Sequence, residues 1–280
     1  MYSIYHRLGR FKFKGIVMQV TKVRCFGGAP GVGNIALVIE NGPAGAEQRQ
    51  AFARDSGHGA CVFLTPLQEN PDRWEADYVY PHARSPLCLH ASLAAAHVLL
   101  GRGGGTQVTL ITAMRGQQVV LTREADAVFA IVQKHAVAPI GIEPGLAAHL
   151  LGEPDLQLAS PPLLSSIGSP KLLIEVVSPA VLHALRPPLD RIVDWGKENG
   201  VNGCYVYCVV GKDVYEGRNF NHVDPAKEDT ATGVAAGALG AWLGRGVVML
   251  QGAALGNPCR IVTQVRGNEI YVGGATEALA

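Results

Sequence analysis

Apolar and polar residues alternate along short stretches of this chain, which is the pattern of half-buried β-strands. The first such stretch begins directly after Met18. Two further segments are predicted to be helices. The predicted strands are Gln19–Phe26, Ile35–Ile39, Cys61–Leu64, Leu172–Val177 and Cys204–Val210, and the predicted helices are Ala46–Arg54 and Arg191–Asn199. The pattern therefore predicts a mixed chain in which strands dominate and helices interrupt them.

Two Ala-rich segments about half a chain apart resemble each other. His90–Gly103 aligns without a gap with Gly233–Gly246, and both end in Leu-Gly-Arg-Gly. The glycine can adopt the left-handed conformation that ends a helix. Because both segments are apolar nearly all round, we expect two helices that are buried on all sides.

A strand, a turn and a second strand follow each of these helices. The pairs are Gln107–Ile111 with Gln118–Leu121, and Val247–Leu250 with Arg260–Val265. A repeat of half the chain indicates one duplicated unit, because solenoid repeats are about 20 to 50 residues long. The sequence predicts a first half at 18–135, possibly completed by a last strand at about 268–280, and a second half at 136–267. We expect the two halves to enclose a cleft.

The composition favours a protein that handles a small molecule. The 280 residues carry a formal net charge of +1, so no strong field attracts nucleic acid or an anionic membrane. No apolar run approaches the roughly 20 residues that span a bilayer. The six cysteines show no C-x-x-C spacing, which argues against zinc and a disulfide framework and fits a reducing cytoplasm.

Residues 1–17 are basic and contain no acidic residue, but they lack the apolar stretch of a secretory signal. Met18 directly precedes the first predicted strand. We therefore interpret 1–17 as an N-terminal extension outside the fold.

Polar or reactive residues stand just before each buried helix. Cys88, Leu89 and His90 precede the first, and Glu228–Gly233 precedes the second. A helix N-terminus presents unpaired N–H groups and about half a positive charge, so it favours a bound carboxylate. Two such termini in one cleft would hold an acidic substrate and its carbanion or enolate without a metal.

Four motifs in this order resemble the signature of PhzF-like proteins, which have the diaminopimelate-epimerase fold. They are Gly33–Val38, Pro86–Ala91, Glu228–Gly237 and Gln251–Gly252, and together they span most of the chain after Met18. The resemblance implies an α+β fold of two pseudo-symmetric barrel-like halves, each around a central helix, and often a homodimer. It also implies an isomerase without metal, flavin or nicotinamide that removes a proton from carbon and returns it elsewhere in a small carboxylate-bearing substrate.

By motif position, the resemblance implies that His90 moves or positions a proton and that Asp229 binds the polar end of the substrate. Imidazole gains and loses a proton near neutral pH. The alternatives are that His90 only caps its helix and that Asp229 is an ordinary acid at a helix N-terminus. The expected substrate-binding residues are Asn34, Gly59, Leu89, Thr232, Gly233 and Val234.

One position departs from the family pattern. PhzF-like enzymes carry a glutamate base before a Phe-Val strand, whereas Gly59 stands at that place here. His58 is the best substitute, because flanking glycines let the backbone approach a ligand and imidazole can accept a proton. Asp55 is the second choice. The alternative is a Gly-rich turn in which His58 is simply solvated.

Two other functions remain open from the sequence. Related epimerases and proline racemases place a cysteine before each of the two helices, and a helix N-terminus can activate a thiol there. Cys88 fits one such position, but Thr230 occupies the other, which leaves one-sided racemase, epimerase or dehydratase chemistry, or a buried structural Cys88. The other possibility is a non-catalytic binding protein on the same scaffold.

Overall fold

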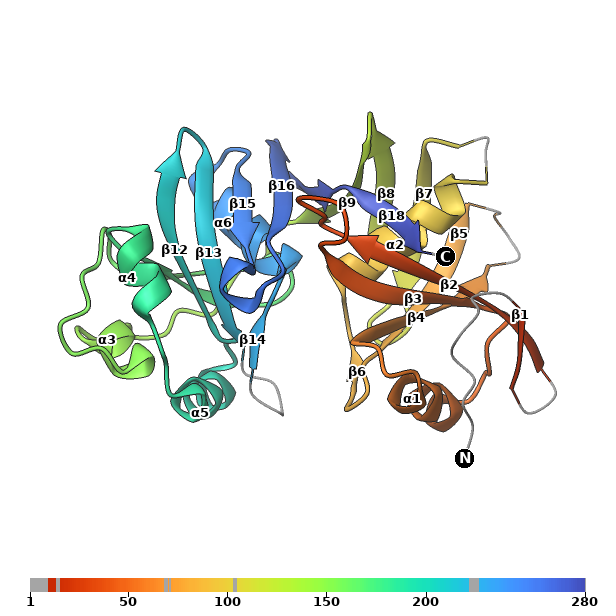
Figure 1. The fold of residues 1–280 in the computed structure, drawn as a ribbon, viewed down its shortest axis with the longest axis horizontal. Helices are drawn as coiled ribbons and strands as arrows, with labels where there is room; N and C mark the ends of the chain where they lie inside the picture. Colours follow the sequence, from red (N-terminus) through yellow and green to blue (C-terminus); the bar gives the residue numbers. More distant parts are fainter. Residues whose placement is uncertain are drawn as a thin grey trace. The chain divides into compact units, whose positions relative to one another are not determined.

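The computed structural model describes residues 10–13, 16–67, 70, 72–102, 105–221 and 227–279 (Figure 1). The chain divides into two compact units. Unit 1 contains residues 1–131 and 273–280, and unit 2 contains residues 132–272. The predicted boundaries at 135/136 and about 267/268 lie four and five residues from those between the units, at 131/132 and 272/273.

Unit 1 is a mixed sheet that curves around one helix. In β2 to β8 the neighbours run antiparallel (β2 and β3), parallel (β3 and β4), antiparallel (β4 and β5), parallel (β5 and β7) and antiparallel (β7 and β8). The helix α2 contacts β2, β3, β4, β7, β8 and β18, so strands surround it. The elements are β1 (Arg10–Phe13), β2 (Ile16–Cys25), β3 (Asn34–Glu40), α1 (Ala46–Asp55), β4 (Ala60–Pro66), β5 (Arg73–Val79), β6 (Arg84–Ser85), α2 (Leu89–Leu100), β7 (Gln107–Thr112), β8 (Gln118–Glu124), β9 (Ala127–Gln133) and β18 (Thr276–Leu279).

Unit 2 repeats this order of pairing. Antiparallel β10–β11, parallel β11–β12, antiparallel β12–β13, parallel β13–β15 and antiparallel β15–β16 follow one another, and α6 contacts β10, β11 and β16. The elements are α3 (Leu146–Leu151), β10 (Leu163–Ser165), β11 (Lys171–Glu175), α4 (Pro179–Ala184), α5 (Leu189–Asn199), β12 (Cys204–Gly211), β13 (Val214–Asn221), β14 (Lys227–Asp229), α6 (Gly233–Leu243), β15 (Val248–Gln251), a 3-10 turn (Ala253–Leu255), β16 (Cys259–Arg266) and β17 (Glu269–Gly274). The predicted α+β fold of two related halves, each with a central helix, is confirmed.

Each unit buries the inner face of its sheet and part of the outer face. The inner face packs on the central helix, and this explains why most residues of α2 and α6 are apolar and buried. The outer face of unit 1 packs Phe63 against Phe52 of α1, with ring centroids 5.8 Å apart. The outer face of unit 2 is covered by α3, α4 and α5 through residues such as Leu150, Leu182 and Ile192.

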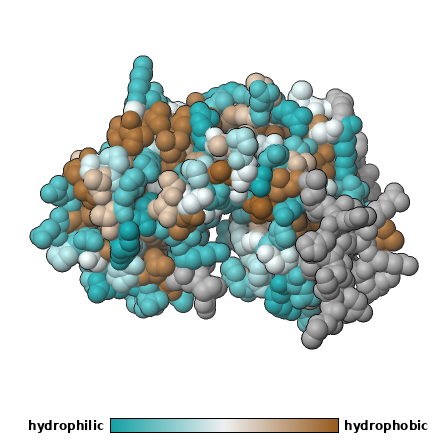
Figure 2. Space-filling view, viewed as in Figure 1, coloured by the Kyte–Doolittle hydropathy of each residue, from teal (hydrophilic) through white to brown (hydrophobic). Residues whose placement is uncertain are grey.

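Apolar side chains also reach the surface. Val209 and Val210 at the end of β12 are 53% and 41% exposed, and Figure 2 shows hydrophobic residues gathered over this part of unit 2. No helix among the described residues is both long and apolar enough to cross a membrane.

The predicted N-terminal extension falls largely outside the described residues. Of 1–17, the structure describes 10–13, 16 and 17. Arg10–Phe13 forms β1, which pairs antiparallel with Ile16–Gln19 at the start of β2. The proposal that the segment lies outside the fold stays a prediction.

Candidate functional site

The N-terminus of α2 carries a cluster of three reactive side chains. Cys88 is the N-cap residue, in an extended conformation, and it is 4% exposed. The Tyr80 hydroxyl donates a hydrogen bond to Cys88 Sγ at 3.1 Å, and His90 Nδ1 lies 3.3 Å from the same sulfur. The thiol is therefore held between a phenol and an imidazole at the positive end of a helix.

This environment changes the acidity of Cys88. Burial opposes ionisation, but attraction to His90 and hydrogen bonds from His90, Tyr80 and the Ala91 N–H outweigh it and lower the pKa of Cys88. The cysteine Cys25 behaves in the opposite way, because burial raises its pKa far above the ordinary value. Among the cysteines of unit 1, Cys88 is therefore the one whose surroundings favour the thiolate.

Cys25 links the cluster to another predicted site residue. Its thiol donates a hydrogen bond to the His90 carbonyl oxygen at 3.2 Å. Cys25 is also the register partner of Asn34, where β3 begins. The structure therefore brings Asn34 and His90 to the same end of unit 1. Leu89, the first residue of α2, is buried at this end.

His58 and Gly59 stand in the turn between α1 and β4. His58 Nδ1 lies 2.6 Å from the Ser56 carbonyl oxygen. Because a carbonyl oxygen can only accept, Nδ1 must carry the proton, which leaves Nε2 of the neutral ring as an acceptor. A Cβ at Gly59 would meet no atom within 4 Å, so there is open space at this position. Asp55, the second candidate, is exposed at the end of α1.

A buried ion pair fixes the segment that leads to Cys88. Asp77 of β5 is 1% exposed and accepts from Arg49 of α1 at 2.9 Å and from Arg84 of β6 at 2.8 Å. Two cations on one carboxylate satisfy both of its oxygens. The contact ties β6 and α1 to β5, and the chain continues from β6 directly into Cys88.

In unit 2 the predicted residues converge at the N-terminus of α6. The Thr232 hydroxyl donates to Asp229 Oδ2 at 2.7 Å. Gln251 Nε2 donates to the Asp229 carbonyl oxygen at 2.8 Å and to Thr232 Oγ1 at 3.1 Å. Gln251 Oε1 accepts from the Thr232 N–H and from the Tyr205 hydroxyl, both at 3.2 Å. Gln251 therefore orients both Thr232 and Asp229.

Gly252 permits this arrangement. Its φ is +91°, and a Cβ there would lie 2.3 Å from the Asn257 carbonyl oxygen and 2.6 Å from that of Thr230. The Gln251–Gly252 motif thus combines an orienting amide with a residue that has to be glycine. Gly233 and Val234 form the first turn of α6, where the first N–H groups of a helix have no partner within it.

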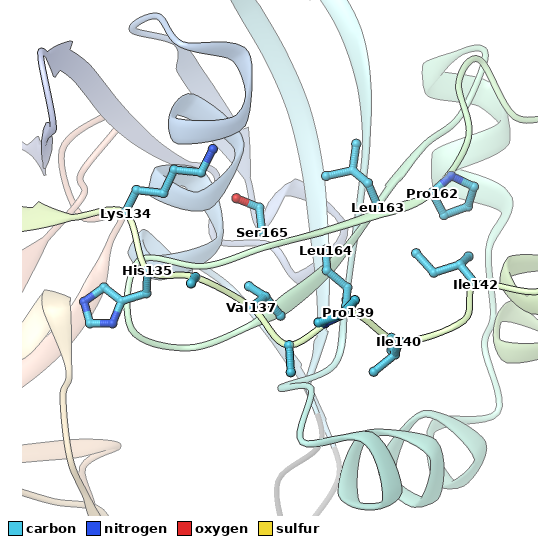
Figure 3. Close-up of a pocket in the computed structure, with 12 residues that line it drawn as sticks. Lys134, His135, Val137, Pro139, Ile140, Ile142, Pro162, Leu163, Leu164 and Ser165 are labelled. Carbon is cyan, nitrogen blue, oxygen red and sulfur yellow. The ribbon is translucent and has the colours of Figure 1, made fainter.

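Two cavities of unit 2 lie away from these residues. One of about 340 Å³ lies between the segment 134–142 and β10, where Lys134 and His135 join mostly apolar residues (Figure 3). Another of about 440 Å³ is lined by residues between Ile142 and Pro162. No predicted site residue lines either cavity. Among the described residues no three His, Cys, Asp or Glu side chains are grouped as a metal site requires.

Sequence reasoning did not identify Tyr80 or the orienting role of Gln251. Tyr80 stands eight positions before Cys88, in a turn in which its N–H bonds to the Ala83 carbonyl oxygen at 2.8 Å. No local pattern links Tyr80 to Cys88, because the pairing of β5 and β6 brings them together. Gln251 was visible as part of a motif, but its four contacts depend on strands far apart in sequence.

Comparison with known proteins gives a consistent result. The family model described as "Phenazine biosynthesis-like protein" matches residues 23–277. "Uncharacterized isomerase YddE" of Escherichia coli (strain K12) is 30% identical over 240 residues, covering 80% of this chain and 78% of its own. An "Uncharacterized isomerase" of Deinococcus radiodurans is 30% identical over 282 residues, 91% of each chain. The structure of a "Predicted Epimerase" from Pseudomonas aeruginosa superposes with a TM-score of 0.76 at 25% identity, over 93% of this chain and 96% of that one.

Proposed function

Because the chain belongs to the family of phenazine biosynthesis-like proteins, we propose that it is an isomerase that removes a proton from one carbon of a small carboxylate-bearing metabolite and returns a proton elsewhere. Relatives named isomerases match four-fifths or more of the chain. The observation that carries the proposal is the contact of His90 with Cys88 at the N-terminus of α2. It provides a group that exchanges protons beside a helix end that stabilises negative charge.

His58 is the proposed base. Its Nδ1–H is held by the Ser56 carbonyl oxygen at 2.6 Å, so Nε2 is the nitrogen that can accept a proton from carbon. A carbonyl oxygen that fixes the tautomer of a histidine is a common device for this purpose. His90 would then return the proton, with Cys88 as its immediate neighbour.

Unit 2 supplies the second part of the proposal. Asp229 is held by the Thr232 hydroxyl at 2.7 Å, and Gln251 fixes Thr232 from the other side. An oriented carboxylate can bind a donor group of a substrate, and the first N–H groups of α6, at Gly233 and Val234, can bind an anionic group. Orientation of this kind raises the rate because the substrate is held ready to react.

The test uses proton exchange with solvent. Small carboxylates that raise the melting temperature are incubated with the protein in ²H₂O, and loss of carbon-bound protons is followed by ¹H NMR. We expect His58→Ala to slow exchange by about 10² to 10⁴, the usual contribution of a general base. The matched control is His135→Ala, which removes an exposed histidine of unit 2.

A second experiment tests whether a carboxylate at position 59 can act as the base. The variant is Gly59→Glu, whose Cβ would meet no atom within 4 Å. In the His58→Ala background it is expected to restore part of the exchange, because it places a carboxylate where the family has its base. Unchanged exchange in His58→Ala would reject His58 as the base. If carboxylates bind to the wild type and to the variants but none of these proteins exchanges carbon-bound protons, the non-catalytic alternative is favoured.

A second candidate function is supported by the lowered pKa of Cys88. The thiolate itself would then act as the acid or base of a racemase, epimerase or dehydratase. Cys88→Ser separates the two possibilities, because a supporting role leaves measurable exchange and a thiol mechanism loses it. Thr230, in the position of a second cysteine, argues against a two-thiol racemase.

A further inference from the structure

The inner face of the unit 2 sheet is unexpectedly polar near the N-terminus of α6. Lys171 of β11 and Asn219 of β13 both have 0% exposure. A buried lysine is costly unless its ammonium group is paired, and a buried amide is costly without hydrogen bonds. The corresponding inner face of unit 1 buries Tyr78, whose hydroxyl pairs with Ser92 at 2.6 Å.

Neutral groups hold the Lys171 amine in place. Nζ donates to the Asn202 carbonyl oxygen and to Asn221 Oδ1, the latter at 3.0 Å. Neither acceptor carries a charge, so neither neutralises an ammonium group. Burial lowers the pKa of Lys171 to about 7, although attraction to Asp229 and Cys204 acts in the opposite direction. The nearby acid that could balance its charge at neutral pH is therefore Asp229.

The register of the strands places Asp229 on the same face of the sheet as Asn219. In the antiparallel pair β13–β14, Asp229 is directly opposite Asn219, and Asn221 is opposite Lys227. Directly opposite side chains lie on the same face, and diagonal neighbours are within reach of long side chains. Lys171 is bonded to Asn221, the diagonal neighbour of Asp229, so the Lys171 amine and Asp229 lie on the same face of the sheet.

The Asn219 side chain is a second, independent observation that this face of the sheet surrounds a polar group. Both its amide nitrogen and its amide oxygen are buried without a hydrogen-bond partner. An orphaned buried amide costs about 1 to 3 kcal/mol, and such groups are rare enough to require an explanation. Asn219 stands opposite Asp229 in the sheet, and a packing role alone would be better filled by an apolar residue.

We propose that Lys171 is a positioning residue for Asp229: its amine, fixed by Asn202 and Asn221 beneath the N-terminus of α6, holds the Asp229 carboxylate in its orientation, and Asn219 belongs to the same polar face of the sheet. The inference rests on the proposed function, in which Asp229 binds the polar end of the substrate. Lys171 does not touch the substrate and acts through Asp229. The other groups near Asp229 include Thr232, whose hydroxyl donates to the carboxylate, Gln251, which donates to the Asp229 carbonyl oxygen, and the side chains of Tyr205 and Cys259.

The test measures the surroundings of the Asp229 carboxylate directly. The ¹³C chemical shift of its carboxyl carbon is recorded at pH 6, where the Lys171 amine is charged, in the wild type, in Lys171→Met and in Lys212→Met, which removes an exposed lysine of the same unit. We expect this resonance to move in Lys171→Met and to stay in place in Lys212→Met, because only Lys171 holds the carboxylate. An unmoved resonance in Lys171→Met would overturn the proposal.

A reciprocal measurement covers the case in which Lys171→Met does not fold. The Lys171 Cε resonance is titrated in the wild type and in Asp229→Asn. Coupling between two sites is reciprocal, so loss of the carboxylate is expected to lower the Lys171 midpoint. Equal midpoints in the two proteins would contradict the proposal. Neither readout needs catalysis, so absence of proton exchange in the wild type would refute the isomerase assignment without affecting these results.

Discussion

Cys88 shows how one residue acquires reactivity from its neighbours. Its position before an apolar helix was visible in the sequence, and so were Asn34, His90, Asp229 and Thr232. The Tyr80 hydroxyl that acts on Cys88 could not be assigned from spacing, because it reaches the sulfur only when β5 and β6 pair. The roles proposed for His58, His90 and Asp229 stay predictions.

The acidity of Cys88 predicts its pattern of alkylation. Below pH 8, iodoacetamide should modify Cys88 before the other cysteines, because burial raises the pKa of Cys61, Cys204 and Cys259 to about 12. Peptide mass spectrometry over a pH series measures this order. Tyr80→Phe removes a hydrogen bond to the sulfur and should move the Cys88 profile to higher pH. Equal profiles in the two proteins would show that Tyr80 does not act on the thiol.

At the scale of elements, alternation and Gly or Pro boundaries were sufficient for β2, β3, β4, β11, β12 and the two central helices. They were insufficient for β5 and β13, which carry polar residues at buried positions. Asp77 is buried because it meets Arg49 and Arg84, and Arg218 is buried because it meets Glu228 at 2.7 Å. These partners come from other elements, so the local pattern could not reveal them.

The buried pair at Asp77 predicts a large loss of stability on substitution. Asp77→Ala would leave Arg49 and Arg84 without their carboxylate, at a cost of about 3 to 5 kcal/mol in the free energy of unfolding. Urea denaturation measures this cost, with the exposed Asp72→Ala as control. A loss below about 1 kcal/mol would mean that the two arginines find other partners or water.

The lowered pKa of Lys171 predicts in which direction the free energy of unfolding changes with pH. Its pKa is about 7 in the folded protein and about 10.4 in an unfolded chain. Between these values the unfolded chain binds more protons, so stability rises with pH there, and the full cost of burying the ammonium group is present below pH 7. From pH 6 to pH 9 the wild type should gain about 2 to 3 kcal/mol relative to Lys171→Met. A constant difference between the two proteins would contradict this pKa.

At the scale of the whole molecule, the duplication was detectable because α2 and α6 share a sequence pattern. The structure extends this likeness to the strands, since both units use the same succession of antiparallel and parallel pairs. The family follows from sequence and fold together. The substrate does not, because the loops that shape a pocket follow no local pattern.

All six cysteines are free thiols, which gives a prediction for the whole chain. The melting temperature should be the same with and without dithiothreitol, because no disulfide closes a loop of the unfolded chain. Calorimetric scans at matched protein concentration measure it. A fall of several degrees on reduction would indicate a cross-link that these thiols do not form in the structure.

The most direct test of the central claim is the fate of deuterium in a carboxylate that binds the wild-type protein. The sample is held in ²H₂O, and ¹H and ¹³C NMR locate each carbon that gains deuterium. The isomerase account predicts deuterium at a carbon different from the one that loses its proton, with a matching shift of the double bond or activated centre. Tight binding without deuterium at any carbon, across a broad set of carboxylates, would contradict it.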